Sequence, residues 1–201
     1  DINGKPFISF ILDQIINYSC ERVYICICYL GEMIINEIGY NYKGVPITYI
    51  TEDKPLGTGG AIINSFNYIK NDFAIVINAD TFCKLDYNLL INRATSLNGC
   101  LLAAVSVENS SRYGRIQITN DDRVKSFFEK SSNSKGYINA GIYFLKKEFL
   151  LKYASGNTYS LEKEIMPHLV SNRQLYAFKI NSFFIDIGIP EDLINCIDTL
   201  K

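Results

Sequence analysis

A glycine-rich segment is the first of two features in this chain whose residue types could perform chemistry. The stretch Pro55-Leu56-Gly57-Thr58-Gly59-Gly60-Ala61 lies between a short apolar run and a helix-like run. Glycine lets another molecule approach the backbone closely, and the N–H groups that open a helix have no partner within that helix. The segment therefore predicts a backbone cradle for a polar or anionic ligand.

Two aspartates form the second feature, because each follows an apolar run that is typical of a buried strand. Phe73–Ile77 leads to Asn78-Ala79-Asp80, and Phe184-Ile185 leads to Asp186. Open α/β sheets place their chemistry at the C-terminal ends of strands. Two carboxylates at neighbouring strand ends can share a Mg²⁺ ion, which also keeps phosphate oxygens in its shell. An N-cap or a turn explains either aspartate alone equally well, but the glycine-rich segment favours metal binding.

Three weaker motifs are compatible with the binding of a sugar. Glu129-Lys130 ends a strand-like run, and alone it is better explained as a solvated charge pair. The amide of Asn139 can donate to and accept from hydroxyl groups, and Gly141 beside it would let a ligand lie against the backbone. Gly114 could offer a backbone amide, although ordinary turns explain these glycines as well. We expect His168 on a helix surface rather than in catalysis.

The composition is that of an ordinary globular domain. The chain has 201 residues, of which 48% are hydrophobic and 20% charged, and this is enough for a sizeable core. A formal net charge of -1 leaves no basic excess for a nucleic-acid partner. No apolar run approaches the roughly 20 residues that span a bilayer, so no membrane partner is expected. No signal peptide is visible, and the sequence predicts a cytoplasmic protein.

Cysteine and histidine usage gives no metal or disulfide framework. The six cysteines are scattered, and no spacing among them and the single histidine resembles a zinc site. Cys26 and Cys28 lie two apart in an expected strand, where they are poorly placed for a disulfide. We interpret the cysteines as buried small hydrophobic residues of a reducing cytosol.

The order of apolar runs predicts an α/β fold with a mixed, mostly parallel, Rossmann-like sheet and helices on both of its faces. The pattern predicts helices over residues 6–19, 32–38, 61–70, 87–97, 147–153, 161–169 and from 190 onward. It predicts strands over residues 23–29, 47–51, 73–78, 101–107, 115–119, 124–129, 138–145, 175–180 and 183–187. We expect one domain over residues 1–201, with a nucleotide-facing half (1–107) and a substrate-facing half (108–201).

Seven short motifs together resemble the sugar-1-phosphate nucleotidylyltransferases, and they occur in the family's order across nearly the whole chain. They are Gly4-Lys5-Pro6-Phe7, Glu52 with 55–61, Asn78-Ala79-Asp80, Arg112-Tyr113-Gly114, Phe128-Glu129-Lys130, Asn139-Ala140-Gly141-Ile142-Tyr143 and Asp186-Ile187-Gly188-Ile189-Pro190-Glu191-Asp192. Within the family, the chain is most similar to D-glycero-α-D-manno-heptose 1-phosphate guanylyltransferases. Mannose-1-phosphate guanylyltransferases and hexose-1-phosphate thymidylyl- or uridylyltransferases are the next alternatives.

The resemblance implies a role for each matching residue and the fold of the nucleotide-diphospho-sugar transferases. Nucleotide binding would fall to Glu52, Leu56, Gly57, Thr58, Gly60 and Asp80. Asp80 and Asp186 would be catalytic and would hold Mg²⁺ on the nucleotide phosphates. Sugar binding would fall to Gly114, Glu129, Lys130 and Asn139. The partners implied are a nucleoside triphosphate, with GTP preferred by resemblance, and a sugar 1-phosphate.

The chain departs from the family pattern at its start. Members of the family begin with a strand and a glycine-rich phosphate loop of the form GGxGTRL, whereas this chain begins just after the corresponding position. We expect the natural protein to carry about 25 to 30 more residues, the size of one short strand–loop unit. Without that loop, a catalytically inactive sugar-nucleotide-binding regulatory subunit is the alternative. A homo-oligomeric interface is compatible with the aromatic residues, although the core is the expected place for most of them.

Overall fold

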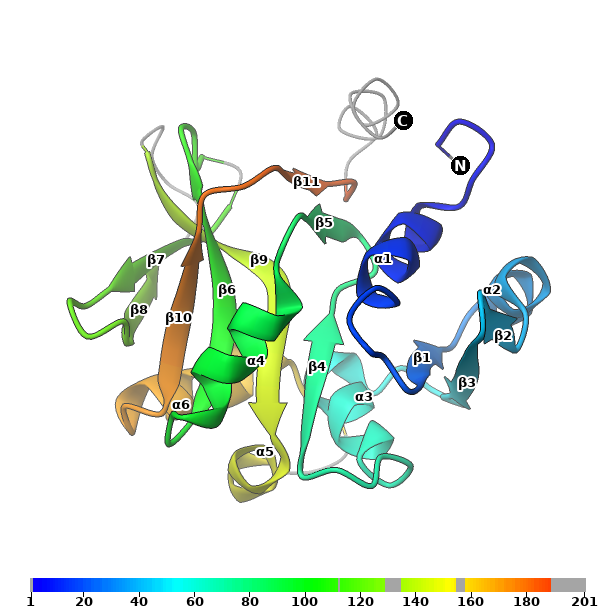
Figure 1. The fold of residues 1–201 in the computed structure, drawn as a ribbon. Helices are drawn as coiled ribbons and strands as arrows, with labels where there is room; N and C mark the ends of the chain where they lie inside the picture. The colour runs from blue at the N-terminus through cyan, green and yellow to red at the C-terminus, as the bar shows by residue number, and fades with distance from the viewer. Residues whose placement is uncertain (1, 112, 129–134, 155–157, 189–201) are drawn as a thin grey trace.

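The computed structural model describes the chain except residues 1, 112, 129–134, 155–157 and 189–201 (Figure 1). The described helices are α1 (Phe7–Ile15), α2 (Gly31–Ile38), α3 (Gly57–Ser65), α4 (Tyr87–Thr95), α5 (Lys147–Tyr153), the π-helical turn η1 (Leu161–Ile165) and α6 (Met166–Ser171). The described strands are β1 (Val23–Ile27), β2 (Asn41–Tyr42), β3 (Val45–Thr51), β4 (Phe73–Ile77), β5 (Thr81–Cys83), β6 (Cys100–Val107), β7 (Arg115–Ile118), β8 (Val124–Phe128), β9 (Gly136–Lys146), β10 (Leu175–Ile180) and β11 (Phe184–Asp186). None of these helices has the length and apolarity needed to cross a membrane.

Strand β9 is the centre of the main sheet, because three strands pair with it. Strands β4, β6 and β7 all run antiparallel to β9, β10 adds parallel to β6, and β8 adds antiparallel to β7. A separate three-stranded sheet joins β1 and β3 in parallel and β2 antiparallel to β3. Strands β5 and β11 form a short antiparallel ribbon beside the main sheet (Figure 1). The ribbon joins residues about 100 positions apart in the sequence.

The predicted mixed α/β fold is confirmed, but the balance of pairings differs from the expectation. Of the eight pairs of named strands among the described residues, only β1–β3 and β6–β10 are parallel. The reason is the position of β9, which enters the sheet between β4 and β6 and runs against both. Alternating strand and helix patterns in the first half of the chain could not reveal that insertion, because it comes from the second half.

Helices cover both faces of the main sheet, as the alternation of side chains along β6 and β9 requires. On one face, Leu102 and Tyr143 pack with apolar residues of α3, α5, η1 and α6. On the other face, Leu101 and Phe144 pack with α4. Helix α1 connects the sheets, since Leu12 packs with β3 whereas Phe7 packs near β5 and β11. All six of these residues are buried: the four from β6 and β9 are at most 1% exposed, and the two from α1 at most 7%.

Most predicted elements are found, and the differences have local causes. Helix α3 begins at Gly57 rather than at Ala61, so the glycines form its first turn instead of a loop. Strands β2 and β5 are too short to leave an apolar pattern of their own. The single helix expected over 161–169 is divided into η1 and α6, with Pro167 in the first turn of α6. The helix expected from Pro190 lies outside the described residues.

The interpretation of the cysteines as buried residues is only partly correct. Cys83 and Cys100 are buried, whereas Cys26 and Cys28 are exposed and Cys20 is half-buried. All five of these described cysteines are free thiols. The thiol of Cys26 lies 3.1 Å from the hydroxyl of Ser65, so α3 gives it a polar neighbour at the edge of the sheet.

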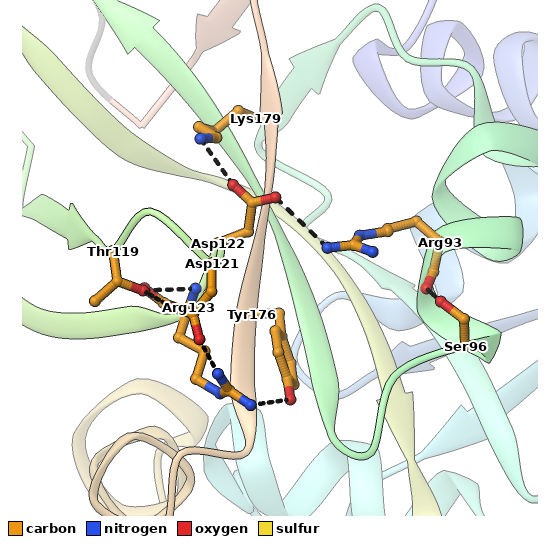
Figure 2. Close-up of polar contacts among 8 residues, drawn as sticks. All are labelled: Arg93, Ser96, Thr119, Asp121, Asp122, Arg123, Tyr176 and Lys179. Atoms are coloured by element: carbon orange, nitrogen blue, oxygen red, sulfur yellow. Dashed lines mark hydrogen bonds and ion pairs between the residues drawn. The ribbon is translucent and has the colours of Figure 1, made fainter.

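The turn between β7 and β8 is fixed to β10 by a cluster of ionic contacts (Figure 2). Asp122 binds Lys179 of β10 at 2.7 Å and Arg93 of α4 at 3.5 Å. Arg123 donates to the hydroxyl of Tyr176 at 3.1 Å, and its guanidinium also lies 5.0 Å from the centre of that ring. The cluster therefore holds one end of the β7–β8 hairpin, whose opposite end carries Gly114 and leads to residue 129.

We expect Arg123→Ala to lower the free energy of unfolding by about 1–2 kcal/mol, because the hydrogen bond and the ring contact to Tyr176 are lost together. Urea denaturation of the purified protein measures this difference. Lys125→Ala is the matched control, because Lys125 is an exposed cation on the adjacent strand. A loss for Arg123→Ala no greater than that for Lys125→Ala would show that the cluster does not stabilise the hairpin.

Candidate active site

Asp80 and Asp186 lie side by side because β5 pairs with β11. In this antiparallel ribbon Asp186 is opposite Thr81, the residue after Asp80. The amide of Ile187 donates to the backbone carbonyl of Asp80 at 2.9 Å, which continues the pairing past the end of β11. The two aspartates come from segments more than 100 residues apart, and the structure brings them together as the sequence predicted.

The two carboxylates act on each other electrostatically. The pKa of Asp80 is raised, first by partial desolvation of the carboxylate, then by the negative charge of Asp186, with a further contribution from Glu162. The side chain of Asp80 nevertheless remains accessible from solvent. Asp186 is half-buried, and its Oδ1 accepts a hydrogen bond from the Gly188 amide at 2.7 Å, which orients it. The accessible carboxylate of Asp80 therefore lies in the field of two further carboxylates, those of Asp186 and Glu162.

The glycines of α3 serve a different purpose from the one predicted. The amides of Gly59 and Gly60 both donate to the carbonyl of Tyr159, at 3.0 and 3.3 Å, and the amide of Tyr159 donates to the carbonyl of Leu56 at 3.0 Å. A Cβ atom at Gly57 would lie 2.6 Å from the Tyr159 carbonyl oxygen. The first turn of α3 is thus packed against the chain before η1. The expectation that its glycine amides are all free for a ligand is wrong for Gly59 and Gly60.

Glu52 and Thr58 shape the two sides of the glycine-rich segment. A carboxylate oxygen of Glu52 accepts a hydrogen bond from the amide of Leu56 at 2.9 Å, so Glu52 closes the loop before α3. Thr58 is exposed, accepts from the amide of Leu161 at 2.9 Å, and donates to a carboxylate oxygen of Glu162 at 2.9 Å. Thr58 therefore connects the segment to η1, from which Glu162 extends toward the aspartates.

Asn139 and Gly141 lie at an irregularity in β9. The pairing of β9 with β6 shifts register between Leu102 and Ala104, and Gly141 has a φ of 72°, which favours glycine. The carbonyl of Ala140 accepts from the Thr81 hydroxyl at 3.2 Å. The carbonyl of Gly141 accepts from the Asn78 amide at 2.8 Å. The bulge thus holds the residues on both sides of Asp80.

Tyr143 and Glu162 are parts of the site that sequence reasoning missed. The side-chain amide of Asn139 donates to the Tyr143 hydroxyl at 2.8 Å, and that hydroxyl donates to Glu162 at 3.3 Å. Tyr143 stood in a family motif but was given no role of its own, and Glu162 lies in a run of charges that a solvated helix face explains. The sequence feature that could have indicated Glu162 is its position directly after the apolar Leu161, which the structure buries. This feature is a weak indication of a functional residue.

The remaining predicted residues are only partly described. Gly114 is exposed next to the end of β8, since a Cβ atom there would lie 3.1 Å from the Phe128 carbonyl oxygen. The ring of Tyr113 meets that of Phe184 of β11 edge-on at 5.8 Å, which brings the start of β7 toward the aspartates. Glu129 and Lys130 lie outside the described residues. His168 is exposed on α6 and stacks on the ring of Tyr153, as expected for a non-catalytic residue.

The aspartate pair fits a hard divalent cation. Two ionised carboxylates that repel each other are stabilised by a cation that both can bind. Among the described residues, no group of three or more His, Cys, Asp or Glu side chains could hold a metal. The protein would therefore supply one or two oxygen ligands, and phosphate oxygens and water would complete the shell. That division suits a cation that enters with a phosphorylated substrate.

The fold and the site together are those of an α/β protein that carries a pair of carboxylates and a glycine-rich helix start. The family model described as "Nucleotidyl transferase" matches residues 1–201. The chain belongs to this family, which confirms the resemblance drawn from its motifs.

Particular relatives narrow the comparison. The chain is 34% identical over 192 residues to D-glycero-alpha-D-manno-heptose 1-phosphate guanylyltransferase of Aneurinibacillus thermoaerophilus, with 95% of this chain and 83% of the relative covered. The enzyme of the same name from Campylobacter jejuni is 34% identical, with 95% and 84% covered. The crystal structure of HddC from Yersinia pseudotuberculosis complexed with GMP-PN matches with a TM-score of 0.89 and 33% identity, and covers 100% of this chain and 88% of that chain.

We expect Gly57→Ala to destabilise the protein because of two effects. The residue has a φ of 73°, and the new Cβ atom would lie 2.6 Å from the Tyr159 carbonyl oxygen, so backbone must move. Gly44→Ala is the matched control, because Gly44 has a φ of 94° but open space around its Cβ position. Chemical denaturation should give a loss of about 1 kcal/mol for Gly44→Ala and a clearly larger one for Gly57→Ala. Equal losses would show that the contact with Tyr159 is not important.

We expect Asp80→Asn to stabilise the cation-free protein at about pH 7. Because the fold raises the pKa of Asp80 from its ordinary value of 3.8, the ionised carboxylate is disfavoured in the folded state; this destabilisation is complete at pH values above the folded-state pKa and disappears below the unfolded-state pKa. The gain in melting temperature should therefore shrink as the pH falls through the folded-state pKa, where the wild-type carboxylate is protonated. Thermal melts across this range in the presence of a chelator measure the effect. A gain independent of pH would contradict the electrostatic explanation.

Proposed function

We propose that this protein is a sugar-1-phosphate nucleotidylyltransferase that joins GTP to D-glycero-α-D-manno-heptose 1-phosphate and releases pyrophosphate. The observation that carries the proposal is the pairing of β5 with β11, which sets Asp80 beside Asp186. The two similar heptose 1-phosphate guanylyltransferases support the base and the sugar. The nucleotide-bound HddC structure supports a nucleotide as one ligand of this fold.

Each candidate residue has a definite task in this proposal. The nucleotide binds at the loop before α3 and at the first turn of this helix, with the glycine backbone close to the base. The residues concerned are Glu52, Leu56, Gly57, Thr58 and Gly60. Asp80 and Asp186 hold Mg²⁺ against the nucleotide phosphates. Gly114, Glu129, Lys130 and Asn139 bind the sugar, with Gly114 acting through its backbone. Mg²⁺, when bound, supplies positive charge that draws electron density from the phosphate oxygens.

The reaction is a single in-line displacement. An oxygen of the sugar 1-phosphate attacks the α-phosphorus of the nucleoside triphosphate and forms a new phosphorus–oxygen bond. The bond between that phosphorus and the bridging oxygen breaks, and the electron pair leaves with pyrophosphate. Such a transfer needs alignment and neutralisation of charge more than covalent chemistry by the protein. The chain's residues align the two substrates and keep the carboxylates oriented.

The proposed substrates also bear on location and assembly. A nucleoside triphosphate and a sugar 1-phosphate are small intracellular molecules, so we place the protein in the cytoplasm and expect the product to serve the synthesis of a bacterial surface glycan such as lipopolysaccharide or capsule. The ordinary net charge supports the absence of a nucleic-acid partner. A homo-oligomer stays a prediction that light scattering of the purified protein would test.

The test is pyrophosphate release by the complete gene product with Mg²⁺. GTP, UTP, dTTP, CTP and ATP are each combined with heptose, mannose, glucose and N-acetylhexosamine 1-phosphates. We expect release with GTP and the heptose 1-phosphate, and a loss of at least about 100-fold in Asp186→Asn with unchanged melting behaviour.

The other outcomes separate the alternatives. If the protein prefers mannose 1-phosphate, the proposed sugar substrate is wrong, and if it prefers UTP or dTTP, the proposed base is wrong. The reaction class would stay the same in both cases. Folded protein that binds the sugar nucleotide but releases no pyrophosphate with any pair would support the inactive regulatory subunit. Near-normal turnover by Asp186→Asn would remove that residue from the mechanism.

A further inference from the structure

A continuous chain of hydrogen bonds connects the nucleotide-side residue Thr58 to the sugar-side residue Asn139. The Thr58 hydroxyl contacts one carboxylate oxygen of Glu162 at 2.9 Å, and the Tyr143 hydroxyl contacts the other at 3.3 Å. The side-chain nitrogen of Asn139 lies 2.8 Å from the same Tyr143 hydroxyl, and its oxygen lies 3.0 Å from the Gly141 amide. The chain joins α3, η1 and β9 through side chains alone.

Backbone amides determine the direction of every bond in this chain. A backbone N–H can only donate, so the Gly141 amide requires the oxygen of Asn139 on its side and turns the NH₂ group toward Tyr143. The Tyr143 hydroxyl accepts from that NH₂ group and therefore donates onward to Glu162. From the other end, the Leu161 amide donates to the Thr58 hydroxyl at 2.9 Å, so Thr58 also donates to Glu162.

Glu162 is consequently the acceptor at which both arms end. Ser160 adds a third hydroxyl, which donates to the same carboxylate oxygen as Thr58 at 3.0 Å. An ionised carboxylate accepts at both oxygens, which an amide side chain cannot do. Tyr143 is almost completely buried, and burial followed by the charge of Glu162 raises its pKa, so the phenol keeps the proton that it donates. The carboxylate is therefore matched to its position.

We propose that Glu162 is a positioning residue that holds the Asn139 amide with its NH₂ group directed into the site, so that a sugar 1-phosphate meets a donor there. This inference rests on the proposed sugar-binding role of Asn139. One hydrogen of the NH₂ group is used by Tyr143, and no contact within the described part of the chain uses the second. The group of the substrate that faces Asn139 must then accept a hydrogen bond, as a hydroxyl or phosphate oxygen does.

The first test is a kinetic cycle of Glu162→Gln, Tyr143→Phe and the double variant. Glutamine keeps the length of the side chain but turns one acceptor into a donor, and phenylalanine removes the middle link. Each single change should raise the KM for the sugar 1-phosphate about tenfold, the size expected for a lost charge-assisted hydrogen bond. In Tyr143→Phe, which leaves the bond between Glu162 and Thr58 in place, the KM for the nucleotide should change less than about twofold. The KM for the sugar 1-phosphate should be no higher in the double variant than in the more impaired single variant, because both changes break the same chain of hydrogen bonds.

A matched control separates position from charge. Glu164→Gln removes the same charge from the same π-helical turn, and the Glu164 carboxylate accepts from the Ser160 amide at 2.6 Å rather than from Tyr143. Its KM for the sugar 1-phosphate should stay within about twofold of the wild-type value. Losses in Glu162→Gln and Tyr143→Phe that multiply in the double variant, or an equal loss in Glu164→Gln, would overturn the proposal.

The second readout does not depend on catalysis. In ¹⁵N-labelled, ligand-free protein, the side-chain amide resonances of Asn139 should shift and exchange faster with solvent in both Glu162→Gln and Tyr143→Phe, and not in Glu164→Gln. Unchanged Asn139 resonances in folded variants would overturn the inference. If the wild type released no pyrophosphate with any substrate pair, the proposed function would fail, but these resonances would still decide whether Glu162 orients Asn139.

Discussion

The bulge in β9 at Gly141 is the constraint on which the site depends. Strand β9 pairs with β4 on one side and β6 on the other, so any local change in its path moves both neighbours. At Gly141 the backbone adopts a left-handed conformation, and a Cβ atom there would lie 2.5 Å from the Thr81 hydroxyl oxygen. Only glycine lets the chain pass this closely. The same turn of backbone sends two carbonyls to Asn78 and Thr81, which flank Asp80, and directs Asn139 toward Tyr143. The bulge at Gly141 therefore positions both the residue proposed to hold the metal ion, Asp80, and the residue proposed to bind the sugar, Asn139.

Sequence reasoning identified the individual strands well because buried strands leave continuous apolar runs. It correctly brought Asp80 and Asp186 together, since both end such runs. It did not show that β9 separates β4 from β6, because strand order depends on contacts between residues about 30 to 70 positions apart, which a local pattern does not contain. For the same reason, Glu162 could not be distinguished from its charged neighbours. Its role comes from Thr58 and Tyr143, and neither is adjacent to it in the sequence.

The glycine-rich segment shows how a correct prediction can rest on an incomplete reason. Closely spaced glycines indicated close approach to the backbone, and the structure has such an approach. The approaching group is the Tyr159 carbonyl, which accepts from Gly59 and Gly60 and occupies the space that side chains would fill. A helix start that is satisfied by its own protein is rigid before any ligand arrives. Thr58 remains exposed at this rigid edge, so the segment can still present a fixed surface to a nucleotide, with fewer free amides than the sequence suggested.

The charges of the site explain why its polar network is built around acceptors. Asp80, Asp186 and Glu162 carry like charges, and the pKa of Asp80 is raised first by partial desolvation and then by the charges of the other two carboxylates. A fold tolerates such repulsion when hydrogen-bond donors stabilise each carboxylate, and all three have them here, since a backbone hydrogen bond also acts on Asp80. Asp186 accepts from the Gly188 amide, and Glu162 accepts from three hydroxyls, whereas Asp80 stays accessible to solvent. Asp80 is thus the carboxylate whose ionised form a bound cation would stabilise most. In the proposed reaction, the hydrogen bonds around Glu162 would keep its carboxylate oriented, and a cation bound with the phosphates would offset the negative charge.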